Sequence, residues 1–179
     1  MEHLPYDVLE HGIRSLPPPP RDEGRVALVV ARPQSGLRDT PERVMLTAQG
    51  GVSGDRWSHR ASLNRECQIT VMRVDVARLI ANGQPLSLFG DNLIVEMDIS
   101  EENLPAGTRL RIGDALCEVT PKPHTGCGKF AERFGQDARD VANAPELASW
   151  RLRGMHVSVV EDGEVSPGDS VRVVFRPGP

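Results

Sequence analysis

The feature that most constrains this fold is a series of short apolar runs, each bounded by residues that favour turns. The runs are rich in valine, leucine and isoleucine, and clusters of glycine, proline, aspartate and asparagine separate them. Such runs between turn clusters are typical of half-buried β-strands. The predicted strands are 25–32, 44–48, 68–72, 93–95, 109–112, 115–120, 155–160 and 170–175. This spacing predicts a mainly β protein, either a barrel or a sandwich.

Turn chemistry accounts for several glycine–aspartate pairs that could otherwise be taken for catalytic groups. Gly113-Asp114 lies between two predicted strands, and Asp162-Gly163 and Gly168-Asp169 occupy similar positions. Glycine and aspartate tolerate the positive φ angles that tight hairpins need. We therefore expect these pairs to close hairpins.

Two regions carry helical rather than strand patterns. Apolar residues at helical spacing predict a short helix over 75–82, with Asn82-Gly83 as its stop signal. Region 128–152 has little β-character and predicts two or three short helices. Residues 1–24, which include a proline run at 17–20, are expected to form an N-terminal extension, and 25–176 the folded domain.

Composition excludes several classes of protein. The 179 residues hold 21 basic and 25 acidic side chains, a net charge of −4, which does not suit a nucleic-acid binder or a polybasic membrane anchor. The longest aliphatic run, 26–31, is far shorter than the roughly 20 residues of a spanning helix. No secretory signal is evident at the start, so a cytoplasmic location without membrane or nucleic-acid partners is expected.

The three cysteines, Cys67, Cys117 and Cys127, include no C-x-x-C pair. This pattern disfavours both a disulfide framework and a closed zinc site, and it favours reduced thiols. Cys117 lies inside a predicted strand, where a packing role is expected. The same role is favoured for Cys67, whereas Cys127 is open to either a packing or a functional interpretation.

The segment around Cys127 is the most informative part of the chain. Cys127 stands between two glycines, after two prolines and just before a predicted helix. A helix N-terminus and nearby cations favour the thiolate form of a cysteine. The chain's two lysines, Lys122 and Lys129, both lie in this segment together with His124. The pattern therefore predicts a reactive thiol with room for a ligand.

Charge is unevenly distributed along the chain. Windows 54–73 and 121–139 each carry a net charge of +2, and Arg151 and Arg153 add two further cations. Window 85–107, in contrast, carries −5. Basic residues thus gather in the windows around the cysteine segment, which indicates an anionic ligand such as a phosphate group.

Taken in order, the motifs resemble the MOSC family, the domain named after the C-terminus of molybdenum cofactor sulfurases. The resemblance covers most of the chain after the proline run. It rests on the order of the following segments: Gly54-Asp55-Arg56, Arg65-Glu66-Cys67-Gln68-Ile69-Thr70, Phe89-Gly90-Asp91-Asn92-Leu93, Leu104-Pro105-Ala106-Gly107, Arg111-Ile112-Gly113-Asp114, Glu118-Val119-Thr120, the Cys127 segment, Arg153-Gly154 and Gly168-Asp169.

The resemblance implies a mainly β fold, a barrel like the small barrel domain of pyruvate kinase, with several short peripheral helices. It also implies a cysteine that either ligates molybdenum in a molybdopterin cofactor or carries sulfur as a persulfide, and Cys127 matches that position. The residues that the resemblance assigns to the cofactor are Arg56, Arg65, Asn92, Lys122, His124, Lys129 and Arg153.

The chain departs from the family pattern at two places. After Gly54-Asp55-Arg56 it has Trp57-Ser58-His59-Arg60, where many small bacterial relatives have a histidine-glycine-glycine stretch. Before Cys127 it has His124-Thr125-Gly126, where others often have proline. Pyridoxal phosphate belongs to the aminotransferase-like domain of the sulfurases, which the chain lacks, so no pyridoxal phosphate site is expected within it.

Three functions follow from these patterns. The first is an oxidoreductase that acts on a small N-hydroxylated or related substrate, with Cys127 as the molybdenum ligand and an electron-donor protein as partner. The second is a sulfur carrier that receives a Cys127 persulfide from a cysteine desulfurase and serves metal–sulfur cofactor assembly. The third is a binding module without chemistry.

Overall fold

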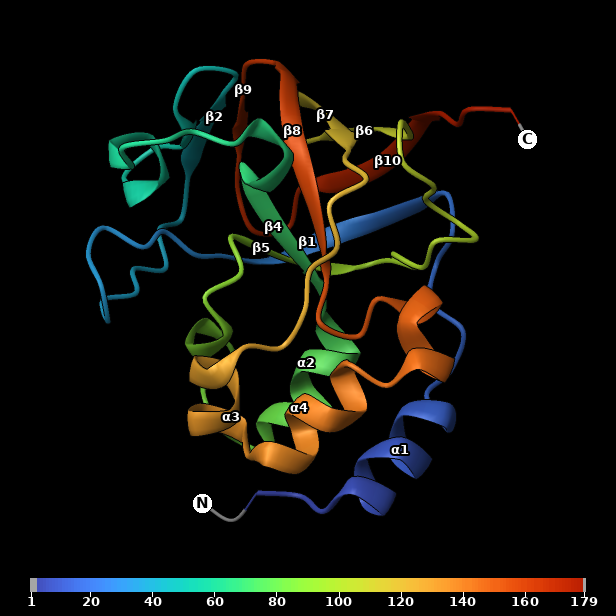
Figure 1. The fold of residues 1–179 in the computed structure, drawn as a ribbon. Helices are drawn as coiled ribbons and strands as arrows, with labels where there is room; N and C mark the ends of the chain where they lie inside the picture. Colours follow the sequence, from blue (N-terminus) through green and yellow to red (C-terminus); the bar gives the residue numbers. More distant parts are fainter. Residues whose placement is uncertain (1–2, 179) are drawn as a thin grey trace.

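A computed structural model describes residues 3–178, and Figure 1 shows a barrel of strands with a group of helices at one end. The barrel is closed in the order β1-β10-β6-β7-β8-β4-β5, and β3-β2-β9 form a separate small sheet. The prediction of a β-barrel with short peripheral helices is confirmed. The strands are β1 (Glu23–Val29), β2 (Val44–Thr47), β3 (Gly51–Val52), β4 (Ile69–Arg73), β5 (Leu93–Glu96), β6 (Arg109–Ile112), β7 (Ala115–Val119), β8 (Met155–Glu161), β9 (Gly163–Val165) and β10 (Ser170–Phe175).

Each of the eight predicted strands overlaps an observed one, and two short strands were not predicted. β3 has two residues and β9 has three, too few to produce a recognisable alternating pattern. Among the barrel neighbours only β4 and β5 are parallel. The hairpin predicted at Gly113-Asp114 joins β6 to β7, and Gly113 has φ +53 as that turn requires.

Helices form the second layer of the molecule. They are α1 (Tyr6–Arg14), α2 (Val74–Ala81), α3 (Gly128–Phe134) and α4 (Gln136–Ala142), with 3-10 turns η1 (Arg56–His59), η2 (Arg65–Cys67), η3 (Leu86–Phe89) and η4 (Pro145–Trp150). α2 is the helix predicted over 75–82, and it ends at Asn82 in the left-handed region, with φ 44. The predicted helical region 128–152 contains α3, α4 and η4.

Residues 1–24, expected to be an extension, include a packed helix. In α1, Leu9 and Ile13 are buried and lie four positions apart, so both occupy one face of the helix. α1 packs against α2 and α4. The proline run then leads to β1, and the carbonyl of Pro20 accepts a hydrogen bond from the Asp98 N–H at 2.8 Å.

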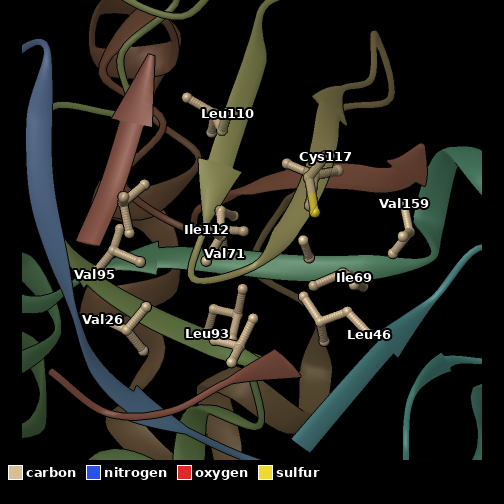
Figure 2. Close-up of a cluster of buried hydrophobic side chains, with 14 of the residues drawn as sticks. Val26, Leu46, Ile69, Val71, Leu93, Val95, Leu110, Ile112, Cys117 and Val159 are labelled. Atoms are coloured by element: carbon tan, nitrogen blue, oxygen red, sulfur yellow. The ribbon is translucent and has the colours of Figure 1, made fainter. Parts of the chain in front are cut away.

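Two apolar clusters stabilise the two layers. The first fills the barrel, where side chains from different strands point toward one another (Figure 2). The second joins α1, α2, α3 and α4 to the outer face of β4 and β5, and it includes Met72, Ile94 and Phe134. The segment from β7 to α3 leaves the barrel and enters the helical layer (Figure 1), and Cys127 is the last residue of this segment, at the N-cap of α3.

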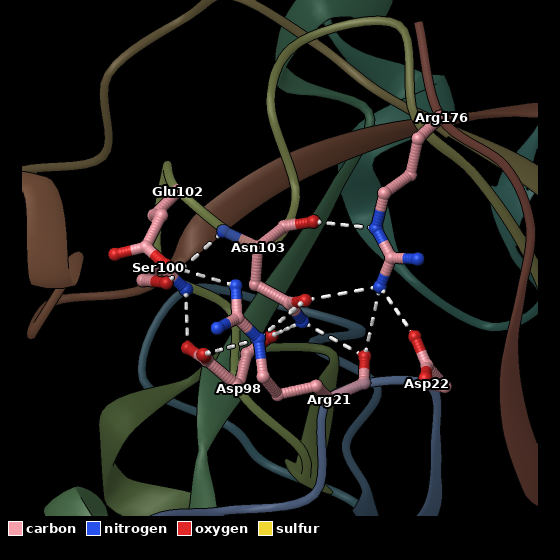
Figure 3. Close-up of polar contacts among 7 residues, drawn as sticks. All are labelled: Arg21, Asp22, Asp98, Ser100, Glu102, Asn103 and Arg176. Carbon is pink, nitrogen blue, oxygen red and sulfur yellow. Dashed lines mark hydrogen bonds and ion pairs between the residues drawn. The ribbon is translucent and has the colours of Figure 1, made fainter.

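A polar network ties both ends of the chain to the loop after β5 (Figure 3). Asn103 is buried, and its amide donates to the carbonyls of Arg21 and Asp98. Its amide oxygen accepts from Arg21 and from Arg176. The network therefore connects the segment before β1, the loop 98–103 and the segment after β10.

No helix among the described residues is both long and apolar enough to cross a membrane.

Candidate functional site

Asn92, just before β5, is the organising residue of a buried polar centre. Its amide group donates to the Val30 carbonyl and to Asp55, at 3.1 and 3.0 Å. Its oxygen accepts from Arg32 at 3.0 Å and from the Thr70 N–H at 3.2 Å. Because these contacts use the whole amide, Asn92 fixes the residues around it.

Asp55 and Arg32 form a buried ion pair beside Asn92. The Arg32 guanidinium donates to both carboxylate oxygens of Asp55, at 2.7 and 3.2 Å. Burial acts to raise the pKa of Asp55, but the hydrogen bonds and charge of Arg32 outweigh it and hold that pKa below its usual value. Asp55 therefore stays ionised and fixes Arg32 in a two-pronged geometry.

Asp91 lies next to Asn92 and is fully buried between a cation and an imidazole. Nη1 of Arg153 donates to Asp91 Oδ2, and Nδ1 of His124 lies 3.5 Å from Oδ1. A glycine at 154 leaves room for His124 in this position, because a Cβ there would lie 3.3 Å from His124 Nδ1 and only 2.4 Å from the Val71 carbonyl oxygen. Gly154 also has φ +106, which a side chain would disfavour.

Burial sets the protonation state of His124. It lowers the pKa of the imidazole to about 3, with Asp91 opposing this shift and Arg153 and His156 adding to it. The neighbouring His156, whose ring centroid is 4.6 Å away, also has a pKa lowered by burial. His124 is thus a neutral imidazole near pH 7, with one ring nitrogen as a hydrogen-bond donor and the other as an acceptor.

The loop that presents Cys127 is held by a two-point clamp. Asn143, which follows α4, accepts from the Gly126 N–H at 2.7 Å and donates to the Gly126 carbonyl at 3.0 Å. Cys127 is the next residue, at the N-cap of α3, with an exposed, free thiol. The clamp fixes the backbone one residue before the thiol, so the direction of the thiol depends on α4.

Residues on both sides of Cys127 contact the buried polar centre. His124, three positions earlier, lies against Asp91. Phe130, three positions later, lies beneath the Arg153 guanidinium, 5.1 Å from its ring centroid. Cys127 therefore lies in a short segment whose residues on both sides contact the centre.

Further arginines lie around the same region. Burial lowers the pKa of Arg38, and the charges of Arg133, Arg32 and Arg56 lower it further, so three other guanidinium groups lie close enough to act on Arg38. Arg38 lies over Gly90, where a Cβ would be 2.9 Å from its Nε. Such a group of cations creates a positive potential suited to an anion.

The predicted site residues do not all lie together. His124, Asn92 and Arg153 belong to the buried polar centre, and Arg56 belongs to the arginine group. Arg65 instead donates to the Val159 carbonyl at 2.8 Å on the barrel wall. Lys122 and Lys129 are both exposed on the loop and on α3.

Six residues of the site were not among the predicted ones: Arg32, Arg38, Asp55, Asp91, Arg133 and Asn143, and of these Arg133 contributed only to the basic window 121–139. Asp55 and Asp91 stand in motifs that the sequence displays, each next to a predicted residue, so an acidic partner for the cations could have been inferred there. Arg32, Arg38 and Asn143 have no local signal. Arg32 and Asp55 are 23 positions apart, and Gly126 and Asn143 are 17 apart.

The other two cysteines have different environments. Cys117 is buried in the barrel, and burial raises the pKa of its thiol to about 12, as a packing role predicts. Cys67 is half-buried in η2. Within residues 3–178, no three His, Cys, Asp or Glu side chains gather in a way that could hold a metal ion. A metal on Cys127 would therefore need further ligands from a cofactor.

These features define a class: a small barrel protein that presents one exposed cysteine beside a buried cationic centre. Sequence comparison agrees with this class, since a family model described as the MOSC domain matches residues 58–172. The chain belongs to the MOSC domain family.

Individual relatives were also found. The uncharacterized protein YflK of Bacillus subtilis is 32% identical over 95 residues, which cover 52% of this chain and 40% of that protein. The chain thus matches less than half the length of this curated relative. Among solved structures, YiiM from Escherichia coli matches with a TM-score of 0.57 at 22% identity. The match covers 87% of this chain and 72% of the YiiM chain. The YUAD protein from Bacillus subtilis has a TM-score of 0.58 at 16% identity, covering 84% and 95%. At these identities the solved structures support the fold alone.

Proposed function

We propose that the chain binds a molybdopterin cofactor through Cys127 and acts as an oxidoreductase on small N-hydroxylated or related substrates. One observation carries the proposal: an exposed thiol lies in a segment that contacts, on both sides of it, a polar centre whose cations exceed its carboxylates. Five arginines, Arg32, Arg38, Arg56, Arg133 and Arg153, gather there with only two carboxylates, Asp55 and Asp91. The MOSC family, whose name refers to this cofactor, supports the same interpretation.

Unsatisfied polar atoms provide a test of whether the site suits such a cofactor. Within residues 3–178, four buried atoms of this region make no hydrogen bond: Nε of Arg38, Nε of Arg153, Nδ1 of His124 and Oδ1 of Asp91. Buried polar atoms usually have a partner, so those that lack one indicate a missing ligand or water. The donors and the cationic excess fit a pterin that carries a phosphate.

The chain's residues then take distinct roles. The Cys127 thiolate would ligate the metal, and Arg38, Arg56 and Arg133 would hold the phosphate. Arg65, Lys122 and Lys129 add positive charge that would attract the cofactor. Asn92 and Asp55 orient Arg32, and neutral His124 can hold or release a proton at a ring nitrogen.

When bound, molybdenum supplies two-electron redox chemistry. Reduction of an N-hydroxylated substrate consumes two electrons and two protons, breaks the N–O bond and releases water. The electrons must come from an electron-donor protein. The protein's own contribution would be to fix the cofactor through Cys127 and to orient the substrate, while solvent would supply the two protons.

Metal content tests the proposal directly. The chain is purified from a host that makes the cofactor, and molybdenum is measured by elemental analysis. We expect about one molybdenum per chain in the wild type and at least a tenfold decrease in Cys127→Ser, since the thiolate is the protein's metal ligand. Cys67→Ser is the matched control and should load normally. Equal loading of both variants would contradict the proposal.

The accessibility of Cys127 supports a second function, that of a sulfur carrier. The thiol is exposed, and a Cβ added at the adjacent Gly128 would meet nothing within 4 Å, so a partner protein could approach it. The thiolate would attack the outer sulfur of a desulfurase persulfide, form a new S–S bond and release the desulfurase thiolate.

Mass spectrometry tests this second function. After incubation with a cysteine desulfurase and cysteine, one added sulfur should appear on the peptide that contains Cys127. It should be absent from the Cys127→Ser variant and from Cys67 and Cys117. An unmodified Cys127 peptide, under conditions in which the desulfurase forms its own persulfide, would argue against sulfur transfer.

A further inference from the structure

A separate cavity lies behind the loop that carries Cys127. It has a volume of about 240 Å³ and lies between the loop 120–125, the end of α4, and residues 148–155. Thr125 and Asn143 belong to its lining, whereas Cys127, among the described residues, does not. Cys127 is therefore a neighbour of the cavity and not part of its lining.

The lining combines an apolar wall with an excess of positive charge. Leu152 and Met155 are buried and provide apolar surface. Lys122 and Arg151 carry positive charge, Glu101 carries negative charge, and His124 is neutral. The cavity thus carries a net charge of +1 at neutral pH, which favours an anion.

Arg151 is the main reason to expect a specific ligand. Its Nη1 donates to the carbonyls of Ile99 and Leu104, at 3.2 and 2.7 Å, which fixes the guanidinium. Its nearest carboxylate, that of Glu101, lies 4.0 Å from Nε, too far for a hydrogen bond. The Arg151 side chain is only 13% exposed, whereas that of Glu101 is 59% exposed. A largely buried, oriented guanidinium whose carboxylate neighbour is exposed and makes no hydrogen bond to it is well suited to bind a second carboxylate.

We propose that this cavity binds a small carboxylate with an apolar body, its carboxylate on Arg151 and Lys122 and its apolar part against Leu152 and Met155. The combination of an apolar wall with a few converging polar groups is what small-molecule sites have in common. The site needs no metal, so it does not depend on the proposed function.

Benzoate is a suitable probe, and benzamide is its neutral counterpart of nearly the same shape. We titrate each into the full chain and follow backbone amide signals by NMR. Benzoate should shift the amides of 122, 124, 125 and 151–155 and bind at least about tenfold more tightly than benzamide, because charged hydrogen bonds stabilise the anion. No shift at about 10 mM benzoate, or equal affinity for benzamide, would overturn the proposal.

The two lysines provide matched variants. Lys122→Ala removes a cation of the lining and should weaken benzoate binding several-fold, whereas Lys129→Ala, outside the lining, should retain the wild-type affinity. Glu101→Gln removes the competing carboxylate and should strengthen binding. Equal effects of Lys122→Ala and Lys129→Ala would show that the anion is attracted by overall charge only, which contradicts a defined site.

Two further variants separate this proposal from the others. Ala148→Trp fills the cavity while retaining Arg151 and Lys122, and it should abolish the benzoate shifts. Circular dichroism and thermal unfolding establish whether the variant is folded. Cys127→Ser should bind benzoate as the wild type does. A loss of molybdenum in Cys127→Ser therefore bears on the proposed cofactor site and not on the cavity. A loss of benzoate binding in Ala148→Trp bears on the cavity and not on the metal.

Discussion

At the scale of single residues, His124 shows how the surroundings of a side chain decide its chemistry. A histidine in a loop after two prolines would be expected to face water and titrate near neutral pH. In the folded chain it lies against Asp91, Arg153 and His156, and burial outweighs the carboxylate and lowers its pKa to about 3. The residue therefore stays neutral where an exposed histidine would begin to charge.

This shift predicts how stability depends on pH. The folded-state pKa of His124 lies below the unfolded value of about 6.5, so the unfolded state binds more protons between these values. Stability from this group is complete above about pH 6.5 and is lost as the pH falls toward 3. We expect the free energy of unfolding to decrease by about 1–3 kcal/mol between pH 7 and pH 4 from this residue alone.

Urea unfolding at several pH values measures the effect. His124→Gln should flatten the pH dependence relative to the wild type, while His59→Gln, at an exposed position, should not. Parallel curves for the wild type and His124→Gln would show that His124 does not stay neutral in the folded chain.

At the scale of elements, the position of Cys127 depends on a helix that follows it in the sequence. The loop 120–127 has no regular backbone pairing of its own. Instead, Asn143 at the end of α4 holds both polar groups of Gly126. Because α4 packs against α1 and α3, the loop stays in place only as long as the helical layer is folded.

Asn143→Ala should therefore release the loop. Loss of two hydrogen bonds to a buried backbone is expected to lower the free energy of unfolding by about 1–3 kcal/mol. It should also speed hydrogen exchange at the Gly126 amide much more than at amides of the barrel. Asn143→Asp, which keeps the acceptor for the Gly126 N–H but loses the donor, should have an intermediate effect. Unchanged exchange at Gly126 in Asn143→Ala would show that the clamp does not hold the loop.

Elements with a clear local pattern were predicted well, and those that depend on distant partners were not. The barrel strands and α2 combine apolar spacing with turn or stop residues, as at Asn82. α1 was missed because its nine residues follow a proline and carry several polar side chains. Its apolar face, Leu9 with Ile13, is buried only because α2 and α4 pack against it in the folded chain.

At the scale of the whole molecule, both ends of the chain depend on one buried side chain. Asn103 connects Arg21, Asp98 and Arg176, and it is 1% exposed. The barrel neighbours β1 and β10 thus have their outer ends fixed to the same loop (Figure 3). This connection stabilises the closed barrel where the chain enters and leaves it.

Asn103→Ala should destabilise the whole molecule. Removing the amide leaves the Asp98 carbonyl without its Asn103 donor and the Arg21 carbonyl with the Arg176 guanidinium, which is expected to cost about 1–3 kcal/mol in the free energy of unfolding. Chemical denaturation of the wild type and the variant measures this change. Glu102→Ala, at a neighbouring side chain that is 82% exposed, is the control and should change the free energy by less than about 1 kcal/mol. Equal effects of the two variants would contradict a structural role for Asn103.

The chain's local patterns were sufficient to predict the barrel strands, the hairpin at Gly113 and the helix after β4. These features depend on the spacing of apolar residues and on turn chemistry, which neighbouring residues determine. The site required the tertiary structure, because Asp91, His124 and Arg153 come from three distant segments. A buried charge must be paired wherever the fold places it, and only the closed barrel with its helical layer brings these partners together beside Cys127.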